Sequence, residues 1–147
     1  MKFENYMILE FPSRSANEAF ARSAVACFAA QLDPTMEELG DIRTAVSEAV
    51  TNAIVHAYPE ELGIVILRCR ILKDNVLDIV VKDRGIGIAD IEQAMQEGFS
   101  TAPESVRNLG FGAGMGLPNM KRNADFFDIK SEVGVGTEIL MKFNLKK

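Results

Sequence analysis

The alternation of apolar and polar positions along the chain predicts five short strands and four helices. Strands are expected over residues 6–11, 63–72, 76–82, 126–132 and 137–143, and helices over 16–31, 33–58, 90–96 and 115–124. Ser15 with Glu18, and Thr35 with Glu38, have the spacing of helix capping boxes, and Pro34 is tolerated in a first helical turn. Helices followed by adjacent strand pairs predict an α+β fold: a two-layer sandwich with helices on one face of a mixed, mainly antiparallel sheet.

Composition narrows the class of protein without naming a function. The 147 residues carry a net charge of −5 and no clustered basic face, which argues against nucleic-acid binding. No uncharged apolar run approaches the roughly 18 residues of a membrane span, and the N-terminus lacks the apolar segment of a secretory signal. Cys27 and Cys69 lie in apolar segments, so we expect two reduced core thiols in a single cytoplasmic domain covering 1–147.

A polar stripe on the second predicted helix is the first candidate for chemistry. Glu48, Asn52 and His56 are spaced four residues apart, which puts them within roughly 80° of one another on the helix surface. A solvated helix face would give the same pattern. However, asparagine is a poor residue for a helix interior and has no charge to keep it in water, so a functional site is the alternative.

Glycines mark two further candidates. Asp83-x-Gly85-x-Gly87 follows a predicted strand, where it is either a plain turn or a close approach of backbone to a ligand. Four alternating glycines from Gly110 to Gly116 end a long loop directly before a helix. A backbone free of side chains at a helix N-terminus can cradle phosphates, although a flexible loop without a ligand would look alike. The chain has no P-loop, dinucleotide-binding, serine-hydrolase or zinc signature, so a nucleotide site must be of another design.

Taken in order, these segments resemble the four motifs of the Bergerat-type ATP-binding fold, which includes gyrase B, Hsp90, sensor histidine kinases and MutL. The motifs are Glu48-x-x-x-Asn52, Asp83-x-Gly85-x-Gly87, Gly112-x-Gly114-x-Gly116 and Gly136-Thr137. Within that superfamily the chain resembles the bacterial anti-sigma factor serine kinases of partner-switching systems. Residues 31–54 are similar to the sporulation type, and residues 90–137 are closer to the switch kinase of the general stress module.

The resemblance implies a role for each matching residue, with ATP and Mg²⁺ as cofactors. Glu48 would be the general base on a serine hydroxyl, and Asn52 would bind the Mg²⁺ that bridges the phosphates. Asp83 and Thr137 would recognise adenine. The remaining residues would contact the nucleotide through backbone or phosphate: Gly85, Gly87, Arg107, Gly112, Gly114, Met115, Gly116 and Leu117.

The resemblance also implies partners and leaves alternatives open. One is a serine/threonine kinase that phosphorylates a STAS-type anti-anti-sigma protein and also sequesters a sigma factor. Another is a switch kinase that does not bind sigma, and a third is a sigma-binding module without catalysis, in which ATP only selects the conformation. Glu48 favours catalysis, because a sequestering module needs no base beside Asn52. A homodimer through the first strand and helix is expected, with no contact to nucleic acid or membrane.

Overall fold

In the computed structural model, which describes residues 3–96 and 116–145, five strands form one sheet in the order β1-β2-β3-β5-β4. The strands are β1 (Asn5–Pro12), β2 (Ile64–Leu72), β3 (Val76–Asp83), β4 (Phe126–Glu132) and β5 (Gly136–Asn144). All four pairings in this part of the chain are antiparallel. The predicted α+β sandwich with a mainly antiparallel sheet is therefore confirmed.

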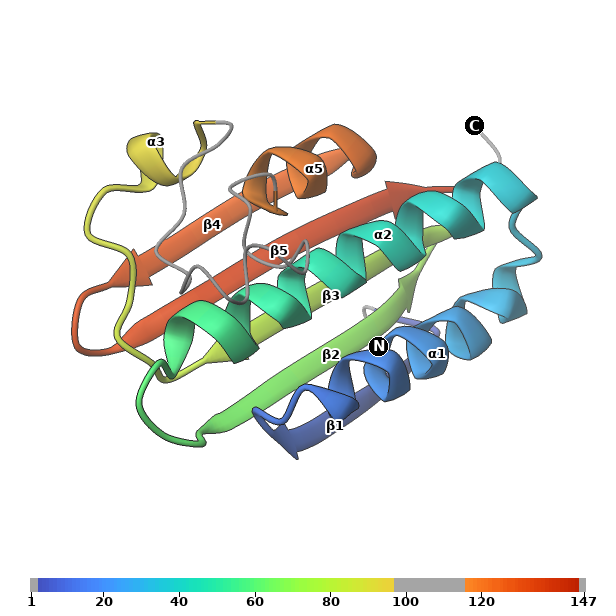
Figure 1. Ribbon diagram of the computed structural model, residues 1–147. Helices are drawn as coiled ribbons and strands as arrows, with labels where there is room; N and C mark the ends of the chain where they lie inside the picture. Colours follow the sequence, from blue (N-terminus) through green and yellow to red (C-terminus); the bar gives the residue numbers. More distant parts are fainter. Residues whose placement is uncertain (1–2, 97–115, 146–147) are drawn as a thin grey trace.

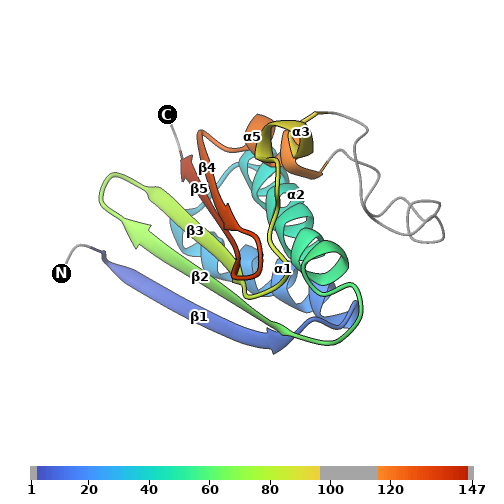
Figure 2. The same cartoon turned by 90° about the vertical axis from the view of Figure 1, so that its left-hand side faces the viewer.

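The helices form a second layer on one face of that sheet (Figures 1 and 2). They are α1 (Ala16–Ala29), α2 (Met36–Asn52), the short α3 (Ile91–Ala94) and α5 (Gly116–Asn123). A 3₁₀ turn at Ala30–Leu32 follows α1, and a π-turn at Ala53–Ala57 follows α2. The helix predicted over 33–58 thus contains two kinds of helical structure. No helix in 3–96 or 116–145 is both long enough and apolar enough to cross a membrane.

The hydrophobic core fills the space between the two layers. Alternate residues of the strands point toward the helices, and Leu67, Ile79 and Met141 are fully buried there. Helix α2 packs Ile42 and Val46 against them. This long central helix therefore lies directly over the middle of the sheet. Helix α2 and the π-turn that continues it, together called the α2 path, carry the polar stripe.

The other face of the sheet carries no helix in the described part of the chain (Figure 2). Tyr6 and Ile8 are more than half exposed there, whereas Asp78 on the same face is only 1% exposed. Arg70 covers Asp78 with two hydrogen bonds of 3.1 Å from its Nε and its terminal nitrogen, and Arg68 approaches to 3.8 Å. A buried carboxylate is tolerated at this position because it is paired and hydrogen-bonded.

Three predictions from the sequence concern the first residues of α1 and α2, and the structure tests each of them. Thr35 forms the predicted capping box with Glu38, but α2 begins at Met36, so Pro34 lies before the cap and not in the first turn. The capping box predicted at Ser15 is wrong. Ser15 itself has helical dihedral angles and its side chain makes no capping bond, while the Glu18 carboxylate lies 3.4 Å from Arg22 Nε.

The prediction of two core thiols holds for one cysteine only. Cys69 is buried in the sheet, and burial raises the pKa of its thiol to about 12, with the nearby charge of Asp78 adding to the rise. Cys27 is exposed. The buried stripe of α1 runs through Ala21, Val25, Phe28 and Ala29, and Cys27 lies off that stripe on the outer side of the helix.

Candidate functional site

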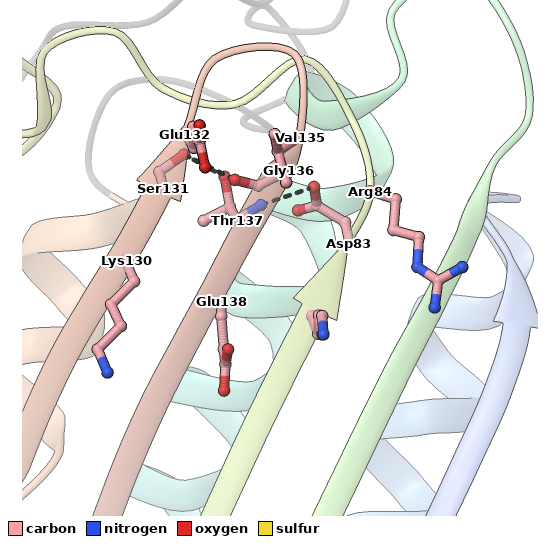
Figure 3. A pocket seen from close by; sticks show the side chains of 10 residues that line it. Asp83, Arg84, Lys130, Ser131, Glu132, Val135, Gly136, Thr137 and Glu138 are labelled. Atoms are coloured by element: carbon pink, nitrogen blue, oxygen red, sulfur yellow. Dashed lines mark hydrogen bonds between the residues drawn. The ribbon is translucent and has the colours of Figure 1, made fainter.

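Asp83 is the buried anchor of a turn at the end of β3. It lies opposite Thr137 in the register of β3 and β5, and it is only 5% exposed. Its Oδ1 accepts hydrogen bonds from the backbone N–H of Gly85 (2.9 Å) and, as Figure 3 shows, from that of Thr137 (3.2 Å). Burial raises the pKa of Asp83 above its ordinary value, and these two N–H groups partly oppose the rise. Oδ2 makes no hydrogen bond to any residue in the described ranges, so it is the oxygen available to a ligand.

Residues 83–88, which we call the adenine turn after the base contact that the resemblance implies for Asp83, rest against the π-turn at the end of the α2 path. The N–H of Ile86 donates to the carbonyl of Ala57 in the π-turn at 2.9 Å. Gly85 permits this contact, because a Cβ built on it would lie 2.1 Å from the same carbonyl oxygen. Glycine is thus required here by close packing of two backbones.

The β4–β5 hairpin holds the adenine turn from the other side. The carbonyl of Ile86 accepts from Gly134 N–H at 2.9 Å, and the N–H of Ile88 donates to Ser131 Oγ at 2.7 Å. Gly87 has a φ of +79°, and a Cβ there would lie 2.3 Å from the carbonyl of Glu132. Only glycine combines this backbone conformation with so close a neighbour.

An open pocket of about 450 Å³ lies at this end of β3, β5 and β4. Figure 3 shows Asp83 and Thr137 at its loop end, with Lys130 and Glu138 further along the strands. Ser131 Oγ lies 2.7 Å from Thr137 Oγ1 and 3.1 Å from the carbonyl of Gly136, so the Thr137 hydroxyl is held in place. Sequence reasoning missed Ser131. Its position could have been inferred by pairing residues outward from the Gly134 turn, which puts Ser131 opposite Thr137.

Glu48 lies at a second place in the site, where α2 meets α5. A side-chain hydrogen bond joins its carboxylate to Asn119, and its Oε2 lies 3.1 Å from the Cβ position of Gly116. Asn119 Oδ1 accepts from Arg122 at 3.0 Å, which leaves the amide nitrogen as the donor to Glu48. Burial raises the pKa of Glu48, the negative charge of Glu18 raises it further, and the hydrogen bond from Asn119 opposes both. Asn119 is another residue that the sequence patterns did not reveal, because its contact with Glu48 joins two helices far apart in the chain.

The other two members of the polar stripe continue along the same helix path. Asn52 is the last residue of α2 and is half-buried, so the stripe is not a solvated face. His56 lies in the π-turn, where burial lowers the pKa of its imidazole and favours the neutral form. Single π-turns inside helices recur at functional sites.

Two of the remaining predicted residues lie at the start of α5. Gly116 begins α5 beside Glu48, while the side chain of Leu117 is buried in the hydrophobic core. Arg107, Gly112, Gly114 and Met115 lie outside the described residues. In the described part of the chain, Glu48 lies beside Gly116, and Asp83 lies beside Thr137 and the glycines of the adenine turn.

Comparison with known proteins identifies the family of the chain. Residues 11–143 match the family model of the histidine kinase-like ATPase domain. The chain is 51% identical to an anti-sigma F factor of Caldanaerobacter subterraneus subsp. tengcongensis, over 96% of this chain and 94% of that protein. It is 47% identical to the anti-sigma F factor of Clostridium acetobutylicum, over 95% of this chain and 93% of that protein.

Solved structures share the fold at lower identity. The RsbU and RsbW domains of a Mycobacterium tuberculosis protein superpose with a TM-score of 0.69 at 17% identity, covering 97% of this chain and 33% of that one. The histidine kinase domain of a blue-light activated kinase from Erythrobacter litoralis gives a TM-score of 0.54 at 22% identity, over 87% of this chain and 60% of that one. The chain belongs to the family of histidine kinase-like ATPase domains that contains the anti-sigma F factors.

Proposed function

We propose that this protein is an ATP-dependent serine/threonine-protein kinase and anti-sigma factor. It would phosphorylate a STAS-type anti-anti-sigma protein and sequester an RNA polymerase sigma factor. The near full-length similarity to proteins named anti-sigma F factor supports both partners. The observation that carries the kinase activity is Glu48, a half-buried carboxylate with a raised pKa, held by Asn119 one helical turn before Asn52.

The proposed nucleotide is ATP with Mg²⁺, and the donor set of the site fits both. Mg²⁺ keeps several waters and takes few protein ligands besides substrate phosphates, so one amide oxygen from Asn52 at the end of α2 is a suitable protein ligand. The free Oδ2 of Asp83 and the hydroxyl of Thr137 suit the edge of an adenine ring. Gly85, Gly87 and Gly116 would let backbone approach the nucleotide. The backbone of Leu117 and the residues Arg107, Gly112, Gly114 and Met115 would enclose its phosphates.

In the proposed reaction Glu48 accepts the proton of the substrate serine as the oxygen attacks the γ-phosphate of ATP. The phosphoryl group passes to the serine and ADP leaves. Bound Mg²⁺ neutralises the phosphate charge, so the protein mainly has to position the reactants. A raised pKa makes Glu48 a better base near neutral pH than an exposed glutamate would be.

We further propose that residues 1–147 act as one cytoplasmic domain that forms a homodimer through β1 and α1. The strand β1 is at the edge of the sheet, so its outer backbone groups are free to pair with another chain. Exposed apolar side chains occur on both elements: Tyr6 and Ile8 on β1, and Phe20 on α1, each more than half exposed.

The test is capture of partners from the host lysate on immobilised protein with Mg-ATP, with mass spectrometry of bound proteins and of new phosphoserines. The wild type should retain a sigma factor and phosphorylate a STAS protein. The Glu48→Gln variant should still bind ATP and sigma but produce no phosphoserine. Glu37→Gln is the matched control, because Glu37 is an exposed residue in the first turn of the same helix.

Each alternative outcome selects a different function. A phosphorylated STAS protein without sigma would make the protein a switch kinase. Sigma capture with no phosphoserine, even for the wild type, would make it a sequestering module. Bound ATP with neither partner would refute both proposed activities, and phosphotransfer at the normal rate by Glu48→Gln would show that Glu48 is not the base.

A further inference from the structure

Tyr58 joins three segments of the chain at the end of the α2 path. It directly follows the π-turn Ala53–Ala57. Its hydroxyl donates a hydrogen bond to the carbonyl of Ile64 at the start of β2 and accepts one from the N–H of Arg84, both at 2.7 Å. A single oxygen atom therefore links the helix end, β2 and the adenine turn.

The ring of Tyr58 packs on the backbone of Gly63, and this contact positions the hydroxyl. A Cβ built on Gly63 would lie only 2.1 Å from the ring, so the ring packs directly on the backbone there. Gly63 is itself held by Ser13: its N–H donates to Ser13 Oγ at 2.9 Å and its carbonyl accepts from Ser13 N–H at 2.8 Å. Ser13 is 5% exposed. The Tyr58 ring thus packs on the end of the sheet where β1 pairs with β2.

Three consecutive N–H groups of the adenine turn have three different partners. Arg84 donates to Tyr58 Oη, Gly85 donates to Asp83 Oδ1, and Ile86 donates to the carbonyl of Ala57. The Gly85 N–H helps to orient the Asp83 carboxylate. The residues on either side of it, Arg84 and Ile86, are each hydrogen-bonded to the end of the α2 path. Losing either of these two hydrogen bonds would let the Gly85 N–H move, and the Asp83 carboxylate, including Oδ2, would then be held less firmly.

We infer that Tyr58 is a positioning residue for base recognition: its hydroxyl holds the adenine turn so that Asp83 Oδ2 points at the amino group of the base. The inference rests on the proposed ATP site. Tyr58 does not line the pocket that contains Asp83 and Thr137. It acts through the backbone of Arg84, and its contribution should therefore appear as selectivity for the base.

The test compares Tyr58→Phe with the wild type in calorimetric titrations with two nucleotides. One is ATP, and the other is purine riboside triphosphate, which lacks the exocyclic amino group. Tyr6→Phe is the matched control, because it removes the same hydroxyl from the only other tyrosine of the chain. Tyr6 is 53% exposed, and its hydroxyl makes no hydrogen bond within residues 3–96 and 116–145.

The expected result is a change in discrimination between the two nucleotides. The wild type should bind ATP roughly tenfold or more tightly than the analogue, because the analogue leaves a buried carboxylate oxygen unpaired. Tyr58→Phe should weaken ATP binding by roughly two- to tenfold, the loss of about one hydrogen bond, with a much smaller change for the analogue. Tyr6→Phe should match the wild type for both nucleotides.

A second measurement tests the contact without any nucleotide. Hydrogen exchange of the Arg84 amide should be slow in the wild type and in Tyr6→Phe, and at least roughly tenfold faster in Tyr58→Phe. An equal loss of affinity for both nucleotides, or unchanged exchange at Arg84, would overturn the inference even with the ATP site intact. A wild type that does not distinguish the two nucleotides would refute the adenine assignment of Asp83 itself, and the inference would be refuted with it.

Discussion

Replacing Asp83 by asparagine is expected to separate nucleotide recognition from stability. The substitution keeps the size of the side chain but turns one oxygen into an NH₂ group. In the wild type Oδ1 accepts two backbone hydrogen bonds, from Gly85 and Thr137, and Oδ2 is left for the ligand. The environment therefore dictates which way the new amide must face.

The side-chain amide of the Asp83→Asn variant can satisfy both backbone N–H groups only if its oxygen takes the place of Oδ1. The opposite orientation would point the NH₂ group at the N–H groups of Gly85 and Thr137, and would leave both backbone donors without an acceptor. The NH₂ group must then occupy the place of Oδ2. A donor would face the amino group of adenine, where the wild type offers an acceptor.

The magnitude follows from the contact that is lost. A hydrogen bond to a charged group contributes about 1.5–3 kcal/mol, and an unsatisfied buried donor costs a similar amount. One such exchange corresponds to a loss of ATP affinity of roughly 10- to 150-fold. Inosine triphosphate carries a carbonyl in place of the amino group. This carbonyl should accept a hydrogen bond from the NH₂ group of the variant, so the preference for ATP over inosine triphosphate should fall or reverse.

Stability should change in the other direction. Because burial raises the pKa of Asp83 in the folded state, the group favours folding below its unfolded pKa near 3.8, and this contribution is lost as the pH rises through the folded value. Above the folded pKa of Asp83 the wild type bears the cost of a buried carboxylate, which asparagine avoids. Asp83→Asn should thus be at least as stable as the wild type at neutral pH, with any advantage disappearing toward pH 3.8.

The assay combines calorimetric binding of ATP and inosine triphosphate with urea unfolding at neutral pH. Unchanged ATP affinity would refute direct recognition of the base by Asp83. A weaker ATP complex together with a large loss of stability would refute the orientation argument, because the affinity loss would then come from a damaged turn.

Three further outcomes are expected. The acid limb of the pH profile of phosphotransfer should lie above pH 4.5, because burial raises the pKa of Glu48 and only its ionised form is a base; a limb at or below 4.5 would contradict this. Gly85→Ala should weaken ATP binding more than tenfold, because the new Cβ would lie 2.1 Å from the carbonyl of Ala57. Its control, Gly40→Ala, has nothing within 4 Å and should raise thermal stability slightly, so equal nucleotide affinity in both variants would refute the packing argument. Asp78→Ala should lower the free energy of unfolding in urea by about 2–3 kcal/mol, because two partly exposed arginines would lose their carboxylate partner. A change below about 0.5 kcal/mol would show that these ion pairs contribute little to stability.

The pattern of apolar positions was sufficient for the elements of the fold because it reflects which face each element buries. All five strands and the helices in the described ranges occur close to where the pattern predicted them. The capping box predicted at Ser15 was wrong because the spacing of two residues does not fix the backbone conformation of the first one. Ser15 and Thr35 have the same spacing to a glutamate, yet only Thr35 has the extended backbone that brings its hydroxyl to the Glu38 N–H.

The candidate site was predictable as a set of motifs but not as a set of contacts. The spacing of Glu48 and Asn52 is a local helical property, and the glycines of the adenine turn mark positions where backbones meet. The neighbouring residues in the sequence do not reveal which backbone segments come into contact. Ala57 packs on Gly85, and Glu132 packs on Gly87, across separations of 28 and 45 residues.

The sequence by itself determined where strands, helices and nucleotide motifs occur, because periodicity, capping and glycine placement act over a few residues. Only the tertiary structure decided that Asp83 lies opposite Thr137, that Asn119 meets Glu48 and that Tyr58 supports the adenine turn. These contacts depend on sheet register and on the packing of α2 against α5. The raised pKa values of Glu48 and Asp83 are likewise tertiary properties, since they arise mainly from burial among residues remote in the chain.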